Sequence, residues 1–275
     1  MLQLFGRNQS RAGAALSRAV RGQEGEFAVA TCADRPDLFE PSVALENEVW
    51  DRLSFLDYTK AHHDYYDKLL ERFPQYRVCM IETATGELVA TGMCVPLRLT
   101  DDVLLPHEGW DWMVETAYEQ DGAGANVIGA LTISVADHHR QRGFARDVIN
   151  TVRTLAALNQ CSSVIVPVRP NAKCDHPYVP MQHYIGWTDD RGRIFDPWLR
   201  SHAAVGGEII GVCERSMVVE EPISFWKPWT GLPLDSDGDV ELPGALAPLT
   251  IDVTAGTGTY VEPNVWVKYR TPVMV

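Results

Sequence analysis

Basic residues are scarce in this sequence, and so are cysteines and long apolar runs. The 275 residues include 24 Lys and Arg against 37 Asp and Glu, a formal net charge of −13, which argues against nucleic acid as the main partner. No apolar run approaches the ~20 residues that a membrane span requires, so we expect no membrane partner. The six cysteines form no C-x-x-C pair and no secretory signal pattern is present, so we expect reduced thiols and a cytoplasmic location.

Common phosphate-binding and metal-binding patterns are also missing. There is no Gly-Lys-Ser/Thr of a P-loop and no G-x-G-x-x-G of a Rossmann turn. The pairs His62-His63 and His138-His139 are adjacent in sequence. Because neighbouring side chains of a helix or strand point in different directions, the sequence predicts no metal site.

The most informative stretch runs from residue 131 to residue 160. It opens with the apolar, β-branched run Leu131–Val135, which predicts a buried strand, and it closes with apolar residues at helical spacing between Ala145 and Leu158. A short turn with two arginines and one glycine joins the two. A helix N-terminus presents unpaired N–H groups and the positive end of the helix dipole, so this turn indicates an anion cradle, most simply for a pyrophosphate.

The turn resembles the acyl-CoA signature Q/R-x-x-G-x-G/A of the GNAT superfamily of N-acetyltransferases. Arg140, Gly143 and Ala145 occupy its three positions, with Ala where the last Gly is an allowed alternative. The resemblance implies that the turn binds the pyrophosphate of coenzyme A and that the preceding strand contacts the pantetheine arm. The cofactor-binding residues implied in this way are Ile133, Val135, Arg140, Gln141, Arg142, Gly143, Phe144 and Ala145.

The order of predicted elements also resembles that family. The predicted strands cover residues 26–32, 76–82, 88–96, 131–135, 163–168 and 208–212, with two strand-like pieces near 250–253 and 260–269. Helical segments are expected over 34–58, broken at Pro36 and Pro41, and over 59–73, stopped by Pro74. The resemblance implies an α/β fold of the α+β type, in which a mixed, mostly antiparallel sheet is splayed at the acyl-CoA site and flanked by helices.

We expect three parts along the chain. Residues 1–25 form an N-terminal arm that is expected to be flexible, residues 26–213 the acyltransferase core, and residues 214–275 a C-terminal extension packed on the core. The extension resembles that of a larger bacterial GNAT subgroup. It is expected to close the substrate side or to contribute to a homodimer interface.

Residues 97–129 lie outside the minimal core of the family. Within them Trp110 and Trp112 alternate with carboxylates, a composition typical of an amine pocket. We interpret Asp111 and Glu115 as candidate catalytic groups that face the amine, with Asp137 as a third candidate base, and we interpret Trp112 as an anchor of a loop.

One further cofactor contact is implied by the resemblance. Asn171 follows strand 163–168, where the family has an Asn that contacts coenzyme A. A turn residue after Pro170 is an equally good interpretation of the same position.

The proton donor is expected on a short helix that Asp196 caps. In the family the last core helix ends Tyr-x-x-x-Gly, and that Tyr protonates the departing thiolate; here His202 stands four residues before Gly206. A histidine with an ordinary pKa near 6.5 can donate a proton at neutral pH. A packing role for His202, and Tyr178 or Tyr184 as the acid, stay open as alternatives.

Together these residues predict an acyl-CoA-dependent N-acyltransferase. With acetyl-CoA or another acyl-CoA as co-substrate and no metal, it is expected to acetylate a small-molecule amine by direct attack on the thioester. Two other functions stay open. GNAT-like loading domains of polyketide synthases, which handle malonyl-CoA and transfer an acyl group to a carrier thiol, also use a histidine in this region. The third is a non-catalytic acyl-CoA-binding protein.

Overall fold

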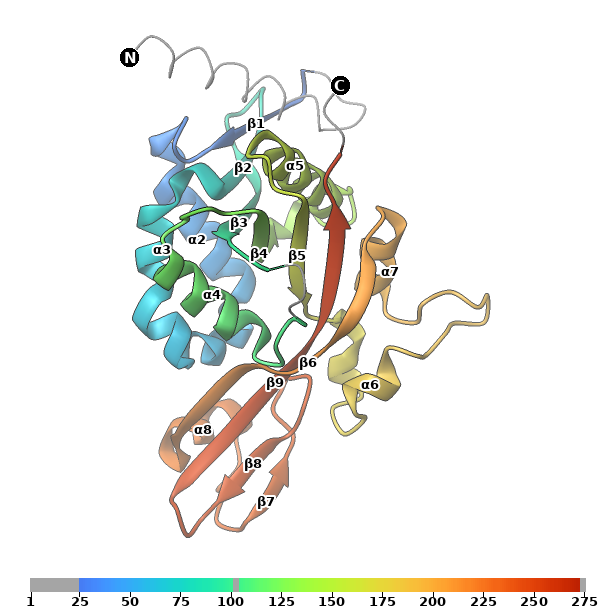
Figure 1. The fold of residues 1–275 in the computed structure, drawn as a ribbon. Helices are drawn as coiled ribbons and strands as arrows, with labels where there is room; N and C mark the ends of the chain where they lie inside the picture. Colours follow the sequence, from blue (N-terminus) through green and yellow to red (C-terminus); the bar gives the residue numbers. More distant parts are fainter. Residues whose placement is uncertain (1–24, 101–103, 273–275) are drawn as a thin grey trace.

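The protein was analysed as a computed structural model that describes residues 25–100 and 104–272. Within these ranges the chain forms one open, mixed and mostly antiparallel sheet of nine strands, with helices on both faces (Figure 1). This is the fold class that the sequence predicts. The predicted N-terminal arm lies outside the described residues, apart from its last residue, Gly25.

The strands are β1 (Phe27–Thr31), β2 (Arg77–Glu82), β3 (Leu88–Leu97), β4 (Val127–Val135), β5 (Ser163–Val168), β6 (Glu208–Pro222), β7 (Gly238–Val240), β8 (Leu249–Asp252) and β9 (Thr257–Arg270). The α-helices are α2 (Phe39–Trp50), α3 (Asp67–Arg72), α4 (Gly109–Gln120), α5 (Phe144–Leu158), α6 (Met181–Tyr184), α7 (Pro197–Ala204) and α8 (Ile223–Thr230). A π-helical turn covers His62–Tyr66, and 3-10 helices cover Pro36–Leu38, Asp51–Tyr58, Pro74–Tyr76, Asp137–His139 and Asn171–Asp175. No helix in the described part of the chain is both long and apolar enough to cross a membrane.

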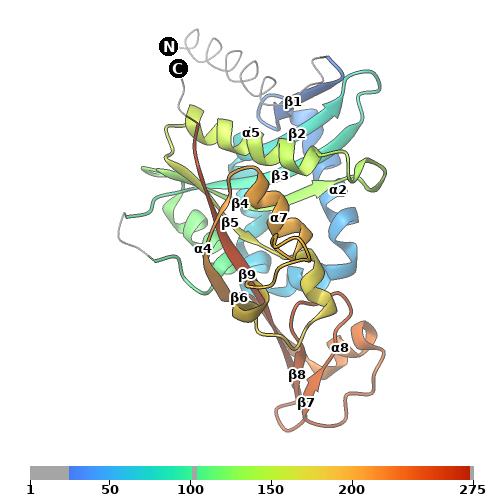
Figure 2. The same cartoon turned by 90° about the vertical axis from the view of Figure 1, so that its right-hand side faces the viewer.

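The sheet runs β1-β2-β3-β4-β5-β9-β8-β7, and β6 pairs with the second edge of β9. α2, α3 and α4 lie together on one face (Figure 1), and α5 and α7 lie on the other, facing the viewer in Figure 2. α5 has a clear apolar stripe that includes Val148, Ile149, Val152 and Leu155, and burial of this stripe fixes the helix against β3 and β4. The cofactor turn therefore begins at a rigid helix.

β4 and β5 separate soon after they pair. Their parallel ladder has only three residue pairs, which end at Gly129 and Ile165, although β4 continues to Val135 and β5 to Val168. On its other side β4 stays paired with β3, with a register shift between Met93 and Cys94. The facing edges of the two strands are thus left open, which is the splay that the family resemblance implies.

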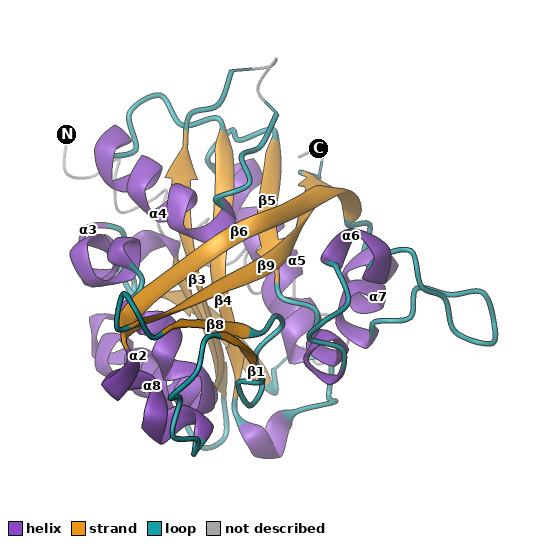
Figure 3. Cartoon of the chain, turned by 90° about the horizontal axis from the view of Figure 1, so that it is seen from below, coloured by secondary structure: helices purple, strands orange, loops and turns teal. Residues whose placement is uncertain are grey.

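β6 and β9 extend beyond the main sheet into a small lobe. Figure 3 shows these two long strands running from the main sheet to β8, and α8 packs beside them. Trp226 of this lobe is fully buried, and its ring lies 6.1 Å from that of Phe55. The expected boundary between core and extension, after residue 213, falls inside β6, which continues through it.

Two of the sequence predictions about helices were wrong. Trp112 was expected to anchor a loop, but residues 109–120 form helix α4, and its buried residues Trp110, Met113, Val114 and Ala117 do have helical spacing. Pro41 was expected to break a helix but lies in the first turn of α2. A proline is tolerated there because the N–H group that it lacks has no partner within the helix.

We predict that Gly109→Ala destabilises the fold by about 2–4 kcal/mol in urea unfolding. The φ of Gly109 is +40°, and an added Cβ would lie 2.3 Å from Ser216 Oγ and 2.9 Å from Cys213 Cβ. Gly86→Ala is the control, because its φ is +76° but its Cβ would have no neighbour within 4 Å. The control is expected to lose only about 1 kcal/mol, from backbone strain. Equal losses would contradict tight packing of α4 on β6.

Candidate active site

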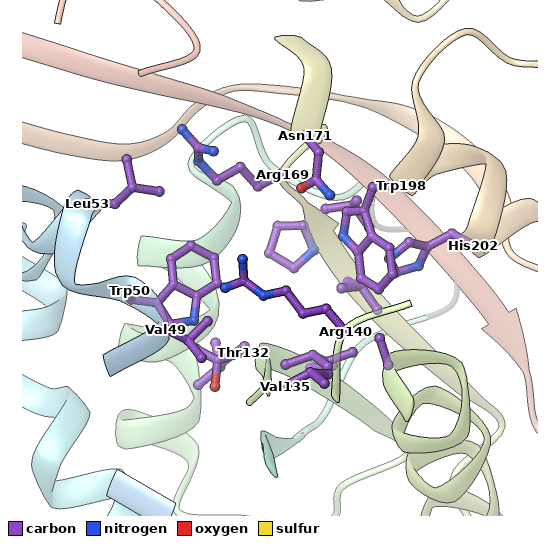
Figure 4. A pocket seen from close by; sticks show the side chains of 17 residues that line it. Val49, Trp50, Leu53, Thr132, Val135, Arg140, Arg169, Asn171, Trp198 and His202 are labelled. Carbon is purple, nitrogen blue, oxygen red and sulfur yellow. The ribbon is translucent and has the colours of Figure 1, made fainter. Parts of the chain in front are cut away.

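A cavity of about 440 Å³ lies between the separated parts of β4 and β5 (Figure 4). We call it the cofactor cleft. The open edges of both strands line it, together with residues of α2, the cofactor turn and α7. Figure 4 shows Trp50 and Leu53 on one wall, Trp198 and His202 on another, and Arg140 reaching between them. The two indole rings and the aliphatic strand residues give the cleft apolar walls, and Arg140 and Arg169 add cationic groups.

Six of the predicted site residues line the cofactor cleft: Ile133, Val135, Arg140, Ala145, Asn171 and His202. They come from five separate segments (β4, the cofactor turn, α5, the 3-10 helix at 171–175 and α7), which the fold brings to one space. Arg140 also forms an ion pair with Asp137, with its Nη2 2.7 Å from a carboxylate oxygen. Because both side chains are largely exposed, an incoming phosphate can replace Asp137 as the partner of this guanidinium.

The backbone conformation of the cofactor turn leaves space at the N-terminus of α5. Gln141 and Gly143 both have positive φ, +66° and +94°, and Gly143 caps α5 without any side-chain hydrogen bond. An added Cβ at Gly143 would have no neighbour within 4 Å, so the N-terminus of α5 is uncovered. The Gly143 carbonyl accepts from the N–H groups of Arg146 and Asp147, and those of Phe144 and Ala145 have no partner among the described residues, so these two can serve an anion cradle.

Two residues of the turn, Arg142 and Phe144, contact neighbouring side chains and do not line the cleft. Phe144 is buried, and its ring packs against Phe27 with 4.7 Å between ring centroids. Arg142 donates from Nη1 to Nδ1 of His139 at 2.8 Å. The Phe144 side chain thus anchors the helix start, and Arg142 is tied to the turn that precedes it.

Contrary to the sequence argument, the adjacent histidines converge. The 3-10 turn at residues 137–139 brings His138 and His139 together with Glu87, and one ligand atom from each lies within 4.8 Å of the others. Arg142 can only donate to Nδ1 of His139, so in the neutral ring the proton is on Nε2. Neither ring nitrogen of His139 then has a free lone pair for a metal ion, so this geometry does not favour a metal site.

His202 is buried, with its side chain 1% exposed, on the side of α7 that faces the cofactor cleft. Asp196 caps this helix as the sequence predicts, accepting from the N–H groups of Trp198 and Leu199 at 2.9 Å each. Nδ1 of His202 is hydrogen-bonded to the Tyr269 hydroxyl, and Nε2 has no partner among the described residues. Burial lowers the pKa of His202 to about 3, so at neutral pH the imidazole is uncharged and the near-neutral pKa that we expected does not hold.

The competing tyrosines do not line the cofactor cleft. Tyr184 is buried and donates its hydroxyl to Asp196 Oδ2 at 2.9 Å, which supports the cap of α7. Tyr178 is exposed. Of the three candidate proton donors, only His202 faces this cavity.

Asp111 and Glu115 lie on α4 and line neither the cofactor cleft nor the cavity beside it. Oδ2 of Asp111 accepts from the Val218 N–H at 3.0 Å, and this bond connects α4 to β6. Burial raises the pKa of Asp111 to about 7. We expected both carboxylates to face the amine, but α4 directs Trp110 to the sheet and so turns Asp111 towards β6.

A second cavity of about 440 Å³ adjoins the cleft, and we call it the acidic cavity. Six residues line both spaces: Trp50, Leu53, Leu131, Thr132, Pro167 and Arg169. Five carboxylates line the acidic cavity against two arginines; they belong to Glu46, Asp51, Asp57, Asp67 and Glu262. The two spaces therefore meet beside β4 and β5; Arg140 lines the first, and carboxylates predominate in the second.

Both arginines of the acidic cavity are already paired. Arg77 Nη2 lies 3.1 Å from Glu46 Oε2, and Arg169 donates from Nε to Glu262 Oε1 at 2.5 Å. His62 adds no positive charge, because burial lowers its pKa to about 4. The remaining carboxylates, of Asp51, Asp57 and Asp67, give the acidic cavity a net negative character.

An aromatic stack forms one wall of the acidic cavity. The π-helical turn places His62 over Tyr66, with 4.7 Å between ring centroids, and the ring of Trp110 lies 5.5 Å from that of Tyr66. Trp110 Nε1 donates to the Leu131 carbonyl at 3.2 Å, which supports β4 where the cavities meet. A π-helical turn is a common feature of functional sites, and no sequence pattern indicated this one.

Comparison with known proteins supports an acetyltransferase. The chain is 34% identical over 276 residues to the arginine N-acetyltransferase avaD of Aspergillus versicolor, covering 88% of this chain and 93% of that protein. Searching the protein-family models gave no match. The relative is fungal, so it does not support the bacterial subgroup that the sequence suggested.

Two solved structures share the fold. The loading GNATL domain of CurA from Lyngbya majuscula superposes with a TM-score of 0.56 at 14% identity, covering 89% of this chain and 98% of that domain. The GphF GNAT-like decarboxylase in complex with isobutyryl-CoA gives 0.52 at 15% identity, covering 90% of this chain and 99% of that one. With the cofactor turn, the splayed strands and the 34% identical relative, these findings show that the chain belongs to the GNAT superfamily as an acyl-CoA-dependent N-acetyltransferase.

Proposed function

We propose that this acetyltransferase acts on a small cationic amine of the arginine class. Acetyl-CoA would occupy the cofactor cleft and the amine the acidic cavity, so that the two substrates meet beside Leu131 and Thr132 of β4. The observation that carries the proposal is that two cavities of opposite character share one wall. The cofactor cleft is lined by the strand and turn that bind coenzyme A in the family, and the acidic cavity adjoins it.

The charge of the acidic cavity supports a cationic acceptor. Carboxylates exceed arginines there, and both arginines have carboxylate partners of their own. A guanidinium or a second ammonium group would offset this excess and gain charge-assisted hydrogen bonds. The relative avaD is named for arginine, a molecule that carries both a guanidinium and an amine.

The geometry also supports direct attack. Neither cavity has a cysteine among its described lining residues, so an acyl-cysteine intermediate has no nucleophile there. β4 supplies backbone N–H groups along its open edge to polarise the thioester carbonyl. Holding the amine and the thioester side by side supplies much of the acceleration. We retain Gln141, Arg142, Gly143, Phe144 and Asn171 as proposed cofactor contacts, through the backbone for Gly143 and Phe144.

Three wider expectations stay proposals. The first is a cytoplasmic location. All six cysteines are free thiols, including Cys32 and Cys79, whose Sγ atoms lie 3.7 Å apart, and free thiols are compatible with a reducing cytoplasm. A homodimer and the covering role of residues 214–275 are the other two.

The direct test is an acetyl-transfer assay with acetyl-CoA and a panel of arginine, agmatine, lysine and a neutral amine. We expect transfer to the guanidino compounds and little to the neutral amine, as measured by release of the CoA thiol. Malonyl-CoA is included because carbon dioxide release without amine acetylation would instead favour the decarboxylase alternative.

Asp57 is predicted to recognise the cation of the acceptor. It lines the acidic cavity with its side chain half-exposed, and partial burial together with the neighbouring Glu46 and Asp67 raises its pKa to about 6. Above pH 6 the carboxylate is charged and attracts the acceptor; below pH 6 it is protonated, so the KM for the guanidino substrate should rise as the pH falls. Asp57→Asn should raise this KM about tenfold at pH 8 and flatten its pH dependence. Asp190→Asn, at an exposed loop position, is the control, and an unchanged KM in Asp57→Asn would refute the role.

Arg140 is predicted to bind the cofactor phosphates. Arg140→Gln should weaken acetyl-CoA binding about tenfold and reduce the thermal stabilisation that acetyl-CoA gives, because a charge-assisted contact is lost. Arg191→Gln, which removes the same charge from an exposed loop, should leave both unchanged. Equal binding by the two variants would argue against the turn as the pyrophosphate site.

A further inference from the structure

The buried histidine of the cofactor cleft has a partner from the far end of the chain. Tyr269, fully buried on β9, is 67 residues from His202 in sequence, and its hydroxyl is hydrogen-bonded to Nδ1 of the imidazole. The contact needs the glycine that follows α7. A Cβ added at Gly207 would lie 2.9 Å from Cε1 of Tyr269 and 2.8 Å from the His202 carbonyl oxygen, so the close approach of β9 to α7 depends on this residue.

The direction of this hydrogen bond fixes where the imidazole proton is. Among the described residues, the hydrogen-bond partner of the Tyr269 hydroxyl is Nδ1 of His202, and either atom could be the donor. If Nδ1 donated, the phenol hydrogen would be buried with no acceptor, which is costly. If the hydroxyl donates, both groups are satisfied and the single proton of the neutral ring is on Nε2. Burial lowers the pKa of His202 and raises that of Tyr269, so both groups are neutral at pH 7.

We propose that Tyr269 is a positioning residue, which holds His202 in the tautomer that directs an Nε2–H donor into the cofactor cleft. Among the described residues that line this cleft, Nε2 of His202 is the buried side-chain nitrogen without a hydrogen-bond partner. Such an atom needs an acceptor, and a bound thioester brings one as its sulfur becomes a thiolate. The catalytic part of this inference rests on the proposed function.

His202 then acts as a hydrogen-bond donor and not as a charged acid. The amine nitrogen forms a bond to the acetyl carbon, the C–S bond breaks, and its electron pair goes to sulfur. The Nε2–H group stabilises this thiolate, and the proton that the amine nitrogen loses ends on the sulfur. The products are the amide and the CoA thiol, and the imidazole is neutral before and after the step.

Arg153 holds the pair in place from a third element. Its guanidinium lies 5.6 Å from the centre of the Tyr269 ring and donates to the Val205 carbonyl, at the end of α7, at 2.9 Å. The same side chain also donates to the Arg270 carbonyl, next to Tyr269. α5, α7 and β9 are thus fixed to one another around the His202–Tyr269 bond.

The first test needs no activity. In ¹⁵N NMR spectra of histidine-labelled wild-type protein, His202 should show a protonated Nε2 and an unprotonated Nδ1 at pH 7. In Tyr269→Phe it should show a mixture of the two tautomers. A wild-type spectrum with the proton on Nδ1 would overturn the proposal, whatever the acceptor of the enzyme is.

The second test is kinetic. Tyr269→Phe should lower kcat about tenfold while the KM for acetyl-CoA changes less than about twofold. In a His202→Ala background the same substitution should have no further effect, because Tyr269 acts through His202.

Tyr76→Phe, which removes a hydroxyl from a buried tyrosine outside both cavities, is the control. An additional loss in the His202→Ala background would show a purely structural role. Absence of any acetyl transfer in the wild type, with the expected NMR tautomer, would refute the proposed function and leave the tautomer assignment standing.

Discussion

The early end of the β4–β5 ladder is the constraint on which the rest of the site depends. Three parallel residue pairs join the strands, and beyond Gly129 and Ile165 their facing edges have no strand partner. Unpaired backbone groups inside a protein are costly unless something else bonds them. The chain keeps the strands apart by fixing each on its other side, β4 against β3 and β5 against β9. The open edges are therefore available to a substrate that can pair with them.

The distribution of charge follows from this geometry. The protein as a whole is acidic, with a net charge of −13, yet the cofactor is a polyanion. Arg140 and the positive end of the α5 dipole supply a local positive field in the cofactor cleft. The carboxylates line the adjoining acidic cavity, which shares Leu131 and Thr132 of β4 with the cofactor cleft. Two substrates of opposite charge can thus bind next to each other without competing for the same groups.

The sequence predicted the features that are local. The strand, turn and helix around Gly143 could be read from consecutive residues, as could the cap of α7 at Asp196, because both depend on backbone chemistry within a few positions. The place of His202 in the cleft was implied by the family resemblance, through the match of His202 and Gly206 to the end of the last core helix. Its altered pKa did not, because the burial that causes it comes from elements far away in sequence.

The acidic cavity and the Tyr269 contact were beyond sequence reasoning for the same reason. The cavity collects residues from α2, a 3-10 helix, a π-helical turn and β9, and no pattern joins them. The prediction for Asp111 was wrong because its hydrogen-bond partner, the Val218 N–H, lies on β6 just after the register shift between Cys213 and Met217. Long-range register of this kind is set by the packing of the whole sheet.

The central claim is that acetyl-CoA and the amine bind together, in two adjoining cavities beside β4, before the acetyl group moves. Initial-rate kinetics with both substrates varied tests it most directly. The account predicts intersecting double-reciprocal lines and no acetylated protein in mass spectra of the enzyme incubated with acetyl-CoA alone. Parallel lines, with an enzyme that gains the mass of one acetyl group, would show a covalent intermediate and contradict it.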